Sequence, residues 1–187
     1  MRLIVAITGA SGVIYGKRLL EVLKENKIET YLIISKASKE IIKHELGMNV
    51  DDLRRLANYF YEEDDFSSPL ASGSFITDGM IIIPCSTKTF SGIAHGYSEN
   101  LILRAAEVTL KEKRKLILVP RETPLNLIHL RNLLELAILG AIIIPAMPAF
   151  YHKPEKINDL VDFVIGKVLD CIGIKHSLFK RWCRWYE

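Results

Sequence analysis

The stretch Leu116-Ile117-Leu118-Val119-Pro120-Arg121-Glu122-Thr123-Pro124 decides the fold of this chain. An apolar run that stops at a proline is typical of a short strand buried at the centre of a parallel sheet. Ligands of open α/β sheets bind just outside the carboxyl ends of such strands. Arg121 and Glu122 would therefore stand at that edge as an anion-binding group beside a proton-transfer group. The alternative interpretation is a surface ion pair on a loop.

Outward from this stretch, strand-like and helix-like segments alternate along the chain. Strands are expected at residues 2–8, 29–34, 80–83, 116–119 and 141–144, and helices at 13–25, 36–46, 51–58, 100–113, 125–139 and 157–169. Continuous apolar strands that alternate with helices predict an α/β protein with a three-layer, doubly wound parallel sheet. The acidic run at 62–65 is expected to be a solvated loop. Residues 1–187 are predicted to form one domain.

Three of the expected strands run into a proline, at Pro84, Pro120 and Pro145. Proline cannot donate a hydrogen bond to the sheet and tends to terminate strand pairing. We therefore expect three chain exits to meet at one rim of the sheet.

Composition and charge limit the classes of partner. The chain has 187 residues, 49% of them apolar and 25% charged, and a formal charge of +3 that is too small to argue for nucleic acid. Cys85, Cys171 and Cys183 are widely spaced, which fits a reducing compartment without disulfides or a zinc site. The apolar region at 139–151 is interrupted by Pro145 and Pro148, so no membrane span is expected. These features predict a soluble, cytoplasmic protein.

Polar groups follow several of the strands. The loop Thr8-Gly9-Ala10-Ser11-Gly12 joins the first strand to the first helix, where glycine and free amides suit a phosphate. Its spacing matches neither the dinucleotide fingerprint nor the Walker A loop, and a turn without a ligand is the alternative. Ser35 ends the second strand and adds a hydroxyl to the same rim, whereas Glu45 lies near the end of the next helix.

The segment Pro84-Cys85-Ser86-Thr87-Lys88-Thr89 carries four consecutive hydroxyl or ammonium groups. Such groups suit the phosphate and ribityl hydroxyls of a mononucleotide, although Ser86 could serve only as a helix N-cap. Cys85 directly follows an apolar strand and is interpreted as a small buried residue rather than a catalytic thiol.

Two further groups allow two interpretations each. Arg104, Glu107 and Lys111 share one helix face and form either a surface ion pair or a phosphate pocket lined by two cations. The aromatic loop at 148–152 either packs on the core or lines an apolar pocket. The basic and aromatic tail, expected to be helical from about residue 174, is assigned to packing on a neighbouring subunit rather than to nucleic acid.

Taken in order, these motifs resemble those of the UbiX-type flavin prenyltransferases. The resemblance is carried by Gly9-Ala10-Ser11-Gly12, Ile34-Ser35-Lys36, Ala71-Ser72-Gly73-Ser74, Pro84-Cys85-Ser86-Thr87-Lys88-Thr89, Arg104-Ala105-Ala106, Pro120-Arg121-Glu122-Thr123-Pro124 and Pro148-Ala149-Phe150-Tyr151-His152. It implies a Rossmann or flavodoxin-like fold and a dodecamer. It also implies transfer of a dimethylallyl group from dimethylallyl monophosphate to N5 and C6 of reduced FMN, without a metal. The prenylated FMN would serve a UbiD-type decarboxylase.

The resemblance also implies residue roles. FMN would contact Gly9, Ala10, Ser11, Ser35, Ser86, Thr87, Lys88, Thr89 and Arg121. The donor phosphate would meet Ser72, Arg104 and Lys111, with Tyr151 and Lys167 from a neighbouring subunit. Some members carry arginine at the Lys167 position, and lysine lacks the planar fork for bidentate phosphate binding. Glu122 would move the protons, assisted by Glu45 and Ser11.

Three rival functions remain open at this point. One is an FMN-dependent cysteine decarboxylase, whose P-x-M-N-x-x-M-W stretch is here Pro145-Ala146-Met147-Pro148 without the asparagine. Another is a carrier that binds FMN and hands it on unchanged. The third is direct decarboxylation of hydroxybenzoate-type acids.

Overall fold

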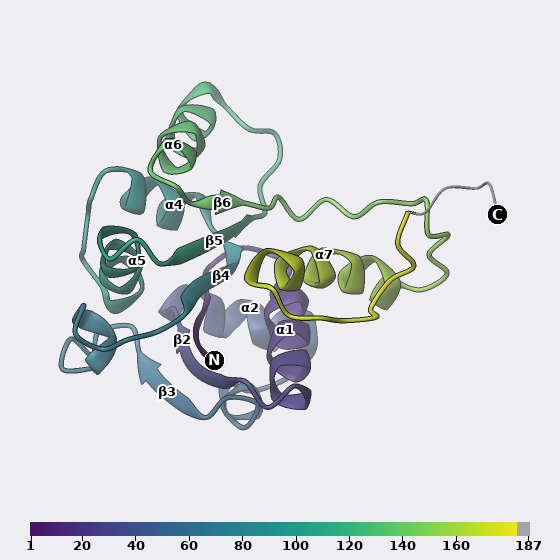
Figure 1. Cartoon of the computed structure of the whole chain (residues 1–187), viewed down its shortest axis with the longest axis horizontal. Coiled ribbons are helices and arrows are strands. Elements are labelled where there is room, and N and C mark those ends of the chain that lie inside the picture. The colour runs from purple at the N-terminus through teal and green to yellow at the C-terminus, as the bar shows by residue number, and fades with distance from the viewer. Residues whose placement is uncertain (183–187) are drawn as a thin grey trace.

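The computed structural model describes residues 1–182 and has one six-stranded, fully parallel sheet (Figure 1). The strands are β1 (Arg2–Ile7), β2 (Glu29–Ile34), β3 (Tyr59–Glu62), β4 (Gly79–Cys85), β5 (Lys115–Pro120) and β6 (Ile142–Ile143). Their order is β3-β2-β1-β4-β5-β6, so the chain reverses direction across the sheet between β1 and β4. This is the Rossmann strand order, and it confirms the predicted doubly wound parallel sheet.

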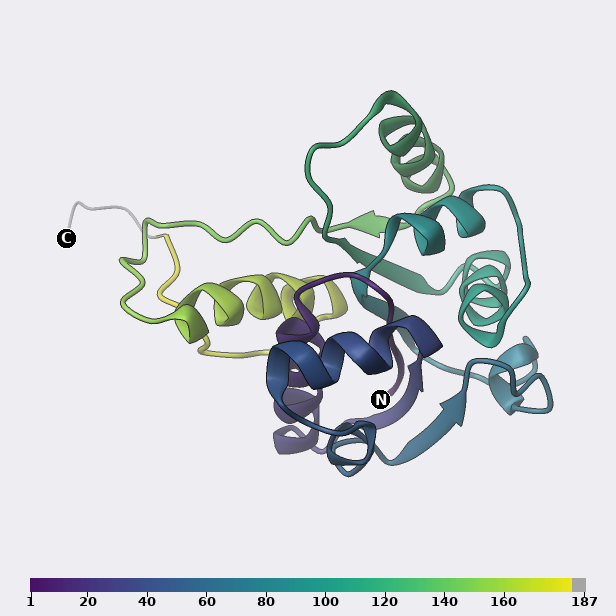
Figure 2. The same cartoon turned by 180° about the vertical axis from the view of Figure 1, so that it is seen from behind.

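Helices cover both faces of the sheet (Figures 1 and 2). The helices are α1 (Val13–Glu25), α2 (Lys36–Leu46), α3 (Val50–Arg54), α4 (Thr87–Ala94), α5 (Leu101–Lys111), α6 (Leu127–Ile138) and α7 (Ile157–Ile172), with a short 3-10 turn η1 (Pro69–Ala71). One apolar core joins the sheet to α1, α2 and α7, and the other joins it to α4, α5 and α6.

The two cores follow from the period of two along each strand. In β1, Leu3, Val5 and Ile7 belong to the first core, whereas Ile4 and Ala6 belong to the second. Both faces of the central strands are therefore buried, which is why these segments are continuously apolar in the sequence.

The region between α2 and β4 differs from the sequence-based expectation. The helix expected at 51–58 ends at Arg54, because Asn58 accepts a hydrogen bond from the Thr30 backbone N–H at 2.9 Å and lies against β2. The acidic run at 62–65 is not simply a solvated loop. Glu62 ends the edge strand β3, and Lys39 of α2 contacts its carboxylate at 2.8 Å.

Two of the three prolines lie inside their strands rather than after them, whereas Pro145 follows β6. Pro84 is within β4 and Pro120 is the last residue of β5, and the β4–β5 register shifts between Ile82 and Cys85. Both prolines act as acceptors only, since Thr8 N–H bonds the Pro84 carbonyl at 3.2 Å and Ala146 N–H bonds the Pro120 carbonyl at 3.1 Å. Because β4, β5 and β6 are parallel neighbours, the chain leaves all three strands at the same edge of the sheet.

The predicted helical tail is wrong for residues 174–182, which are irregular. α7 ends at Gly173 with φ +81°, and the chain then folds back along the helix. Phe179 and His176 pack so close to Gly166 that a Cβ there would lie 2.4 Å and 2.5 Å from their rings. Arg181 also binds Asp170 at 2.7 Å. The rest of the tail, with Cys183, lies outside the described residues.

Across residues 1–182, α7 and the other helices are all too short or too polar to cross a membrane. Cys85 and Cys171 are free thiols.

Candidate functional site

A pocket of about 310 Å³ opens at the carboxyl ends of β1, β2 and β4, where the strand order reverses. We call it the serine pocket. It is lined by Gly9, Ser35, Lys36, Ala37, Glu63, Ser86, Thr87, Lys88, Thr89, Asn100, Ile102 and Leu103. Six residues of the predicted FMN set therefore meet here, from three loops far apart in the sequence.

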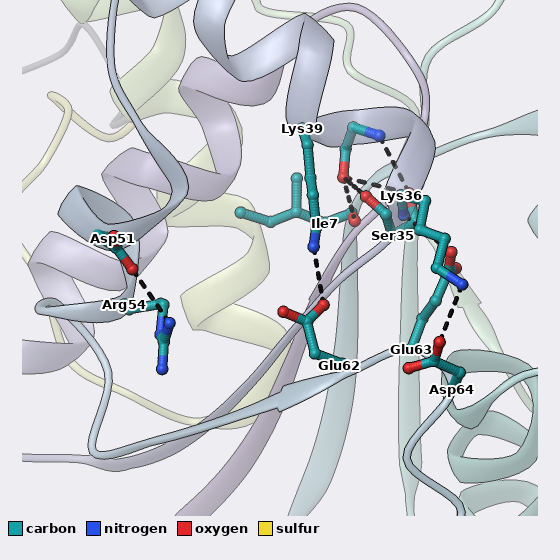
Figure 3. A network of polar contacts seen from close by, with 10 residues as sticks. Ile7, Ser35, Lys36, Lys39, Asp51, Arg54, Glu62, Glu63 and Asp64 are labelled. Atoms are coloured by element: carbon teal, nitrogen blue, oxygen red, sulfur yellow. Dashed lines mark hydrogen bonds and ion pairs between the residues drawn. The ribbon is translucent and has the colours of Figure 1, made fainter.

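Two helices begin at this pocket, each capped by a serine. Ser35 Oγ accepts from Ser38 N–H at 3.3 Å at the start of α2, and Ser86 Oγ accepts from Thr89 N–H at 3.4 Å at the start of α4. Ser38 anchors the first cap to the sheet through its Oγ, 3.0 Å from the Ile7 carbonyl (Figure 3). Two helix N-termini directed at one pocket create a region of positive potential that suits an anion.

The Thr8 side chain connects the end of β1 to the end of β4 and to the serine cap of α4. Its Oγ1 donates to the Pro84 carbonyl at 2.9 Å and accepts from Ser86 N–H at 2.8 Å. The loop after β1 and the start of α4 are thus held together by one buried hydroxyl. Sequence reasoning missed this role, because the partners lie 76 and 78 positions away.

The glycines of the first turn allow the start of α2 to pack closely against it and give it a left-handed backbone. A Cβ on Gly9 would lie 2.8 Å from the Ala37 Cβ, and Gly12 has φ +96°. Glycine is required at both positions, at Gly9 for space and at Gly12 for the left-handed backbone. Gly9 and the serine caps Ser35 and Ser86 line the same pocket, which offers amides and hydroxyls to a bound phosphate.

Glu45 is not free in solvent but closes the N-terminus of α1. Its Oε2 accepts from Gly12 N–H at 2.9 Å and Val13 N–H at 3.2 Å. On the other side of this turn, Arg121 Nε donates to the Ser11 carbonyl at 3.1 Å. The structure therefore brings Glu45, Ser11 and Arg121 together around the loop after β1.

Glu122 faces a second pocket of about 460 Å³ at the end of β5, which we call the Glu122 pocket. It is lined by Pro120, Arg121, Glu122, Thr123, Leu125, Leu133, Pro145, Ala146 and Met147. The Glu122 carboxylate accepts from the Thr123 N–H at 2.9 Å. Arg121 lines this pocket and also donates to the Ser11 carbonyl. It therefore connects the loop after β1 with the pocket that contains Glu122.

The residues predicted to bind the donor phosphate cluster around the loop after η1. Arg104 Nε donates to the Ala71 carbonyl at 3.1 Å, and its guanidinium contacts Glu107 at 2.9 Å. Glu107 also accepts from Ser98, which with Arg104 lowers the pKa of this carboxyl. Lys111 pairs with Glu112 at 2.6 Å rather than with Glu107. Within residues 1–182, the linings of the serine pocket and the Glu122 pocket do not include Arg104, Lys111 or Ser72.

Tyr151 lies on the long segment after β6, which projects from the sheet, whereas Lys167 lies on α7, which packs against α1 and the sheet (Figure 1). The Tyr151 ring contacts Phe163 at 5.9 Å and Trp182 at 5.3 Å between ring centroids. Lys167 is exposed on α7. Within the described part of one chain, neither residue lines the serine pocket or the Glu122 pocket.

Cys85 lies at the end of β4, fully buried between the two pockets. Burial raises the pKa of its thiol far above the ordinary value, because the thiolate would lose its hydration. A protonated, inaccessible thiol is a poor nucleophile, which agrees with the interpretation of Cys85 as a core residue. Residues 1–182 contain no group of three or more His, Cys, Asp or Glu side chains that could hold a metal ion.

Comparison with known proteins agrees with this geometry. The family model described as Flavoprotein matches residues 1–169. A relative from Methanocaldococcus jannaschii, flavin prenyltransferase UbiX, is 58% identical over 182 residues, covering 97% of this chain and 98% of the relative. The chain belongs to the flavoprotein family, and within it to the UbiX-type flavin prenyltransferases.

Solved structures match over nearly the whole chain. The structure of AnUbiX (PadA1) in complex with FMN and dimethylallyl pyrophosphate has a TM-score of 0.97 and 45% identity, covering 98% of both chains. A dodecameric FMN-dependent UbiX-like decarboxylase from Escherichia coli O157:H7 has a TM-score of 0.96 and 47% identity, covering 98% of this chain and 100% of that one. The peptidyl-cysteine decarboxylase EpiD, at 22% identity and a TM-score of 0.61, shares the fold alone.

Proposed function

We propose that this chain transfers the dimethylallyl group of dimethylallyl monophosphate to N5 and C6 of reduced FMN. The observation that carries the proposal is the pair of pockets at the carboxyl edge of the sheet, a hydroxyl-rich one at two helix N-termini and one containing the Glu122 carboxylate. The M. jannaschii relative is named a flavin prenyltransferase, and the AnUbiX structure holds FMN with a dimethylallyl donor. The product, prenylated FMN, would be used by a UbiD-type decarboxylase.

In this proposal the serine pocket binds the flavin. Ser35, Ser86, Thr87, Lys88 and Thr89 would contact its phosphate and ribityl groups, because these residues line the pocket at the starts of α2 and α4. Gly9, Ala10 and Ser11 would form the edge along the first turn, and Arg121 would complete it from β5. Reduced FMN supplies the nucleophilic N5 and the C6 carbon to which the dimethylallyl group becomes attached.

Glu122 would carry the proton transfers. Its carboxylate lies in a pocket with apolar walls and is held by one neighbouring backbone amide, so it can reach a bound substrate. It would remove the proton from C6 and donate one to the departing phosphate. Glu45 would assist by fixing the turn that carries Ser11, since it bonds the next two amides.

The departing phosphate would be stabilised by cations and hydroxyls. Arg104 and Lys111 are each paired with a glutamate in the single chain and would exchange these partners for the phosphate, next to Ser72. Tyr151 and Lys167 would come from a neighbouring subunit, because in the described part of their own chain neither lines the serine pocket or the Glu122 pocket. A homo-oligomer is therefore part of the proposed site.

The surface of α6 supports assembly. Leu127, Ile128, Leu130, Leu134 and Ile138 on this helix are each more than half exposed. A contiguous apolar face of this kind is typical of a protein–protein interface. The E. coli relative is described as dodecameric, and we propose the same assembly, located in the cytoplasm, for this chain.

Anaerobic incubation of the protein with reduced FMN and dimethylallyl monophosphate tests the proposal. Mass spectrometry of the released flavin should show an increase of one five-carbon unit. Unaltered FMN would refute the prenyltransferase and favour a carrier.

Direct decarboxylation deserves a parallel assay, since the E. coli relative is described as a decarboxylase. The same protein should release no carbon dioxide from hydroxybenzoate, from phenylacrylate or from a peptide ending in cysteine when no other enzyme is present. Release of carbon dioxide with unmodified flavin would instead identify a decarboxylase.

A further inference from the structure

Glu63 links the beginnings of two helices at the serine pocket. Its carboxylate Oε1 accepts from the Lys36 backbone N–H at 2.9 Å, and Oε2 lies 3.4 Å from the Asn100 side-chain amide. Its backbone carbonyl accepts from Leu101 N–H at 2.7 Å. Figure 3 shows the side chain rising from the end of β3 toward Ser35 and Lys36. One acidic residue therefore contacts the first turn of both α2 and α5.

The carboxylate lies where an anionic ligand would bind. Lys36 N–H is the first amide of α2, one of the groups that a helix N-terminus offers to a phosphate. Glu63 lines the same pocket as the serine caps Ser35 and Ser86. The protein thus carries a negative charge of its own inside the pocket assigned to the flavin phosphate.

The neighbouring charges do not cancel this one. Lys36 Nζ is paired with Asp64 at 2.9 Å, and Lys39 Nζ is paired with Glu62 at 2.8 Å (Figure 3). The two lysines are thus matched by two carboxylates, and the charge of Glu63 is left over. Lys88, in the first turn of α4, also lines the pocket.

We propose that Glu63 determines how tightly the flavin phosphate is held, by competing with it for the N-terminus of α2. The inference rests on the proposed function, in which FMN is consumed and the modified flavin must leave. When the flavin leaves, the Glu63 carboxylate returns to the Lys36 N–H. This competition favours release of the modified flavin. The carboxylate opposes the phosphate by charge repulsion and leaves the flavin ring unaffected.

The test compares two flavins and two matched variants of the full chain. Glu63→Gln removes the charge but keeps an oxygen that can accept from Lys36 N–H. Glu62→Gln removes the same charge one residue earlier, outside the pocket lining. Dissociation constants for FMN and for riboflavin, which has no phosphate, are measured by titration of flavin fluorescence.

Glu63→Gln should bind FMN about 5- to 10-fold more tightly than the wild-type protein, as expected for removal of one nearby like charge. Its riboflavin affinity should stay within about twofold, because no phosphate is present to be repelled. Glu62→Gln should leave both affinities unchanged. Unchanged or weaker FMN binding in Glu63→Gln, or an equal change for both flavins, would overturn the proposal in favour of a purely structural role.

Asn100→Asp provides a second variant should Glu63→Gln fold poorly. Aspartate can still cap α5, where Asn100 Oδ1 now accepts from Leu103 N–H at 3.0 Å, but it adds a negative charge to the same pocket. FMN binding should weaken relative to riboflavin binding, and an equal effect on both would contradict the proposal. If these affinity changes are observed but the protein transfers no prenyl group, the proposed function is refuted while the role of Glu63 in phosphate binding stands.

Discussion

The serine pocket and the Glu122 pocket are built in different ways, although both lie at the carboxyl edge of the sheet. In the serine pocket, Ser35 and Ser86 are fixed by helix caps, and the buried Thr8 hydroxyl joins two strand ends. In the other pocket, Glu122 stands on a loop and accepts a hydrogen bond from its own neighbour, Thr123. In the proposed function, the first arrangement provides a fixed binding site for the flavin, and the second provides an exposed carboxylate for proton transfer. Variants that affect one pocket should therefore leave the other intact.

The largest effect is expected for Glu122→Gln. Loss of the proton-transfer group should slow prenyl transfer by about 10²- to 10⁴-fold, while the FMN dissociation constant stays unchanged. Anaerobic single-turnover mass spectrometry gives the rate, and flavin fluorescence gives the affinity. Glu25→Gln, at the exposed end of α1, is the matched control and should behave as wild type. A large loss of FMN affinity in Glu122→Gln would break the separation of the two pockets.

Thr8→Val should have an intermediate effect, confined to the serine pocket. Valine keeps the shape but leaves the Pro84 carbonyl and the Ser86 N–H without their partner. The free energy of unfolding should fall by about 1–3 kcal/mol, and FMN should bind about tenfold more weakly.

Thr109→Val is the control for this change. It removes another buried hydroxyl, which bonds the Ala105 carbonyl within α5 at 2.7 Å, away from the pocket lining. Chemical denaturation should show a loss of stability without a change in FMN affinity. Equal FMN affinities in the two variants would contradict the role assigned to Thr8.

The smallest effect is expected for Cys85→Ala, which lies between the pockets and contributes to neither lining. Prenyl transfer and FMN affinity should both remain within about twofold of wild type, with about 1 kcal/mol lost in stability from the missing sulfur.

Alkylation checks the same residue in the unaltered protein. Because burial raises the pKa of the Cys85 thiol, iodoacetamide should leave it unmodified even at pH values of about 9, where an ordinary thiol is largely ionised. Partly exposed Cys171 should react and serves as the internal reference. Rapid modification of native Cys85, identified by peptide mapping, would reopen the catalytic-thiol interpretation.

Much of the fold could be predicted from the sequence because both faces of the central strands are buried. The continuous apolar runs at β1, β2, β4 and β5 identified these strands. β3 was missed because its aromatic residues are followed at once by acidic ones, and because edge strands carry no continuous apolar run. Helix α4 was missed because Thr87, Lys88 and Thr89 were interpreted as ligand groups at the rim of the sheet, whereas they form its first turn.

The site could be predicted only where its residues lie at strand ends. Ser35 and Ser86 were found in this way and do line one pocket. The contacts of Thr8, Glu45 and Glu63 depend on partners 27 to 78 residues away, and no local pattern reveals them. Which subunit supplies Tyr151 and Lys167 depends on the assembly and stays a prediction.

The short edge strand β3 has a consequence for the behaviour of the protein at high concentration. An unpaired strand edge with aromatic residues is a template for intermolecular strand addition. Here the strand is four residues long, Tyr59 stacks on Tyr31 at 4.7 Å, and the Arg54 guanidinium covers the Phe60 ring at 4.4 Å. The shortness of the strand and the acidic residues that follow it both disfavour the addition of a second chain at the β3 end of the sheet.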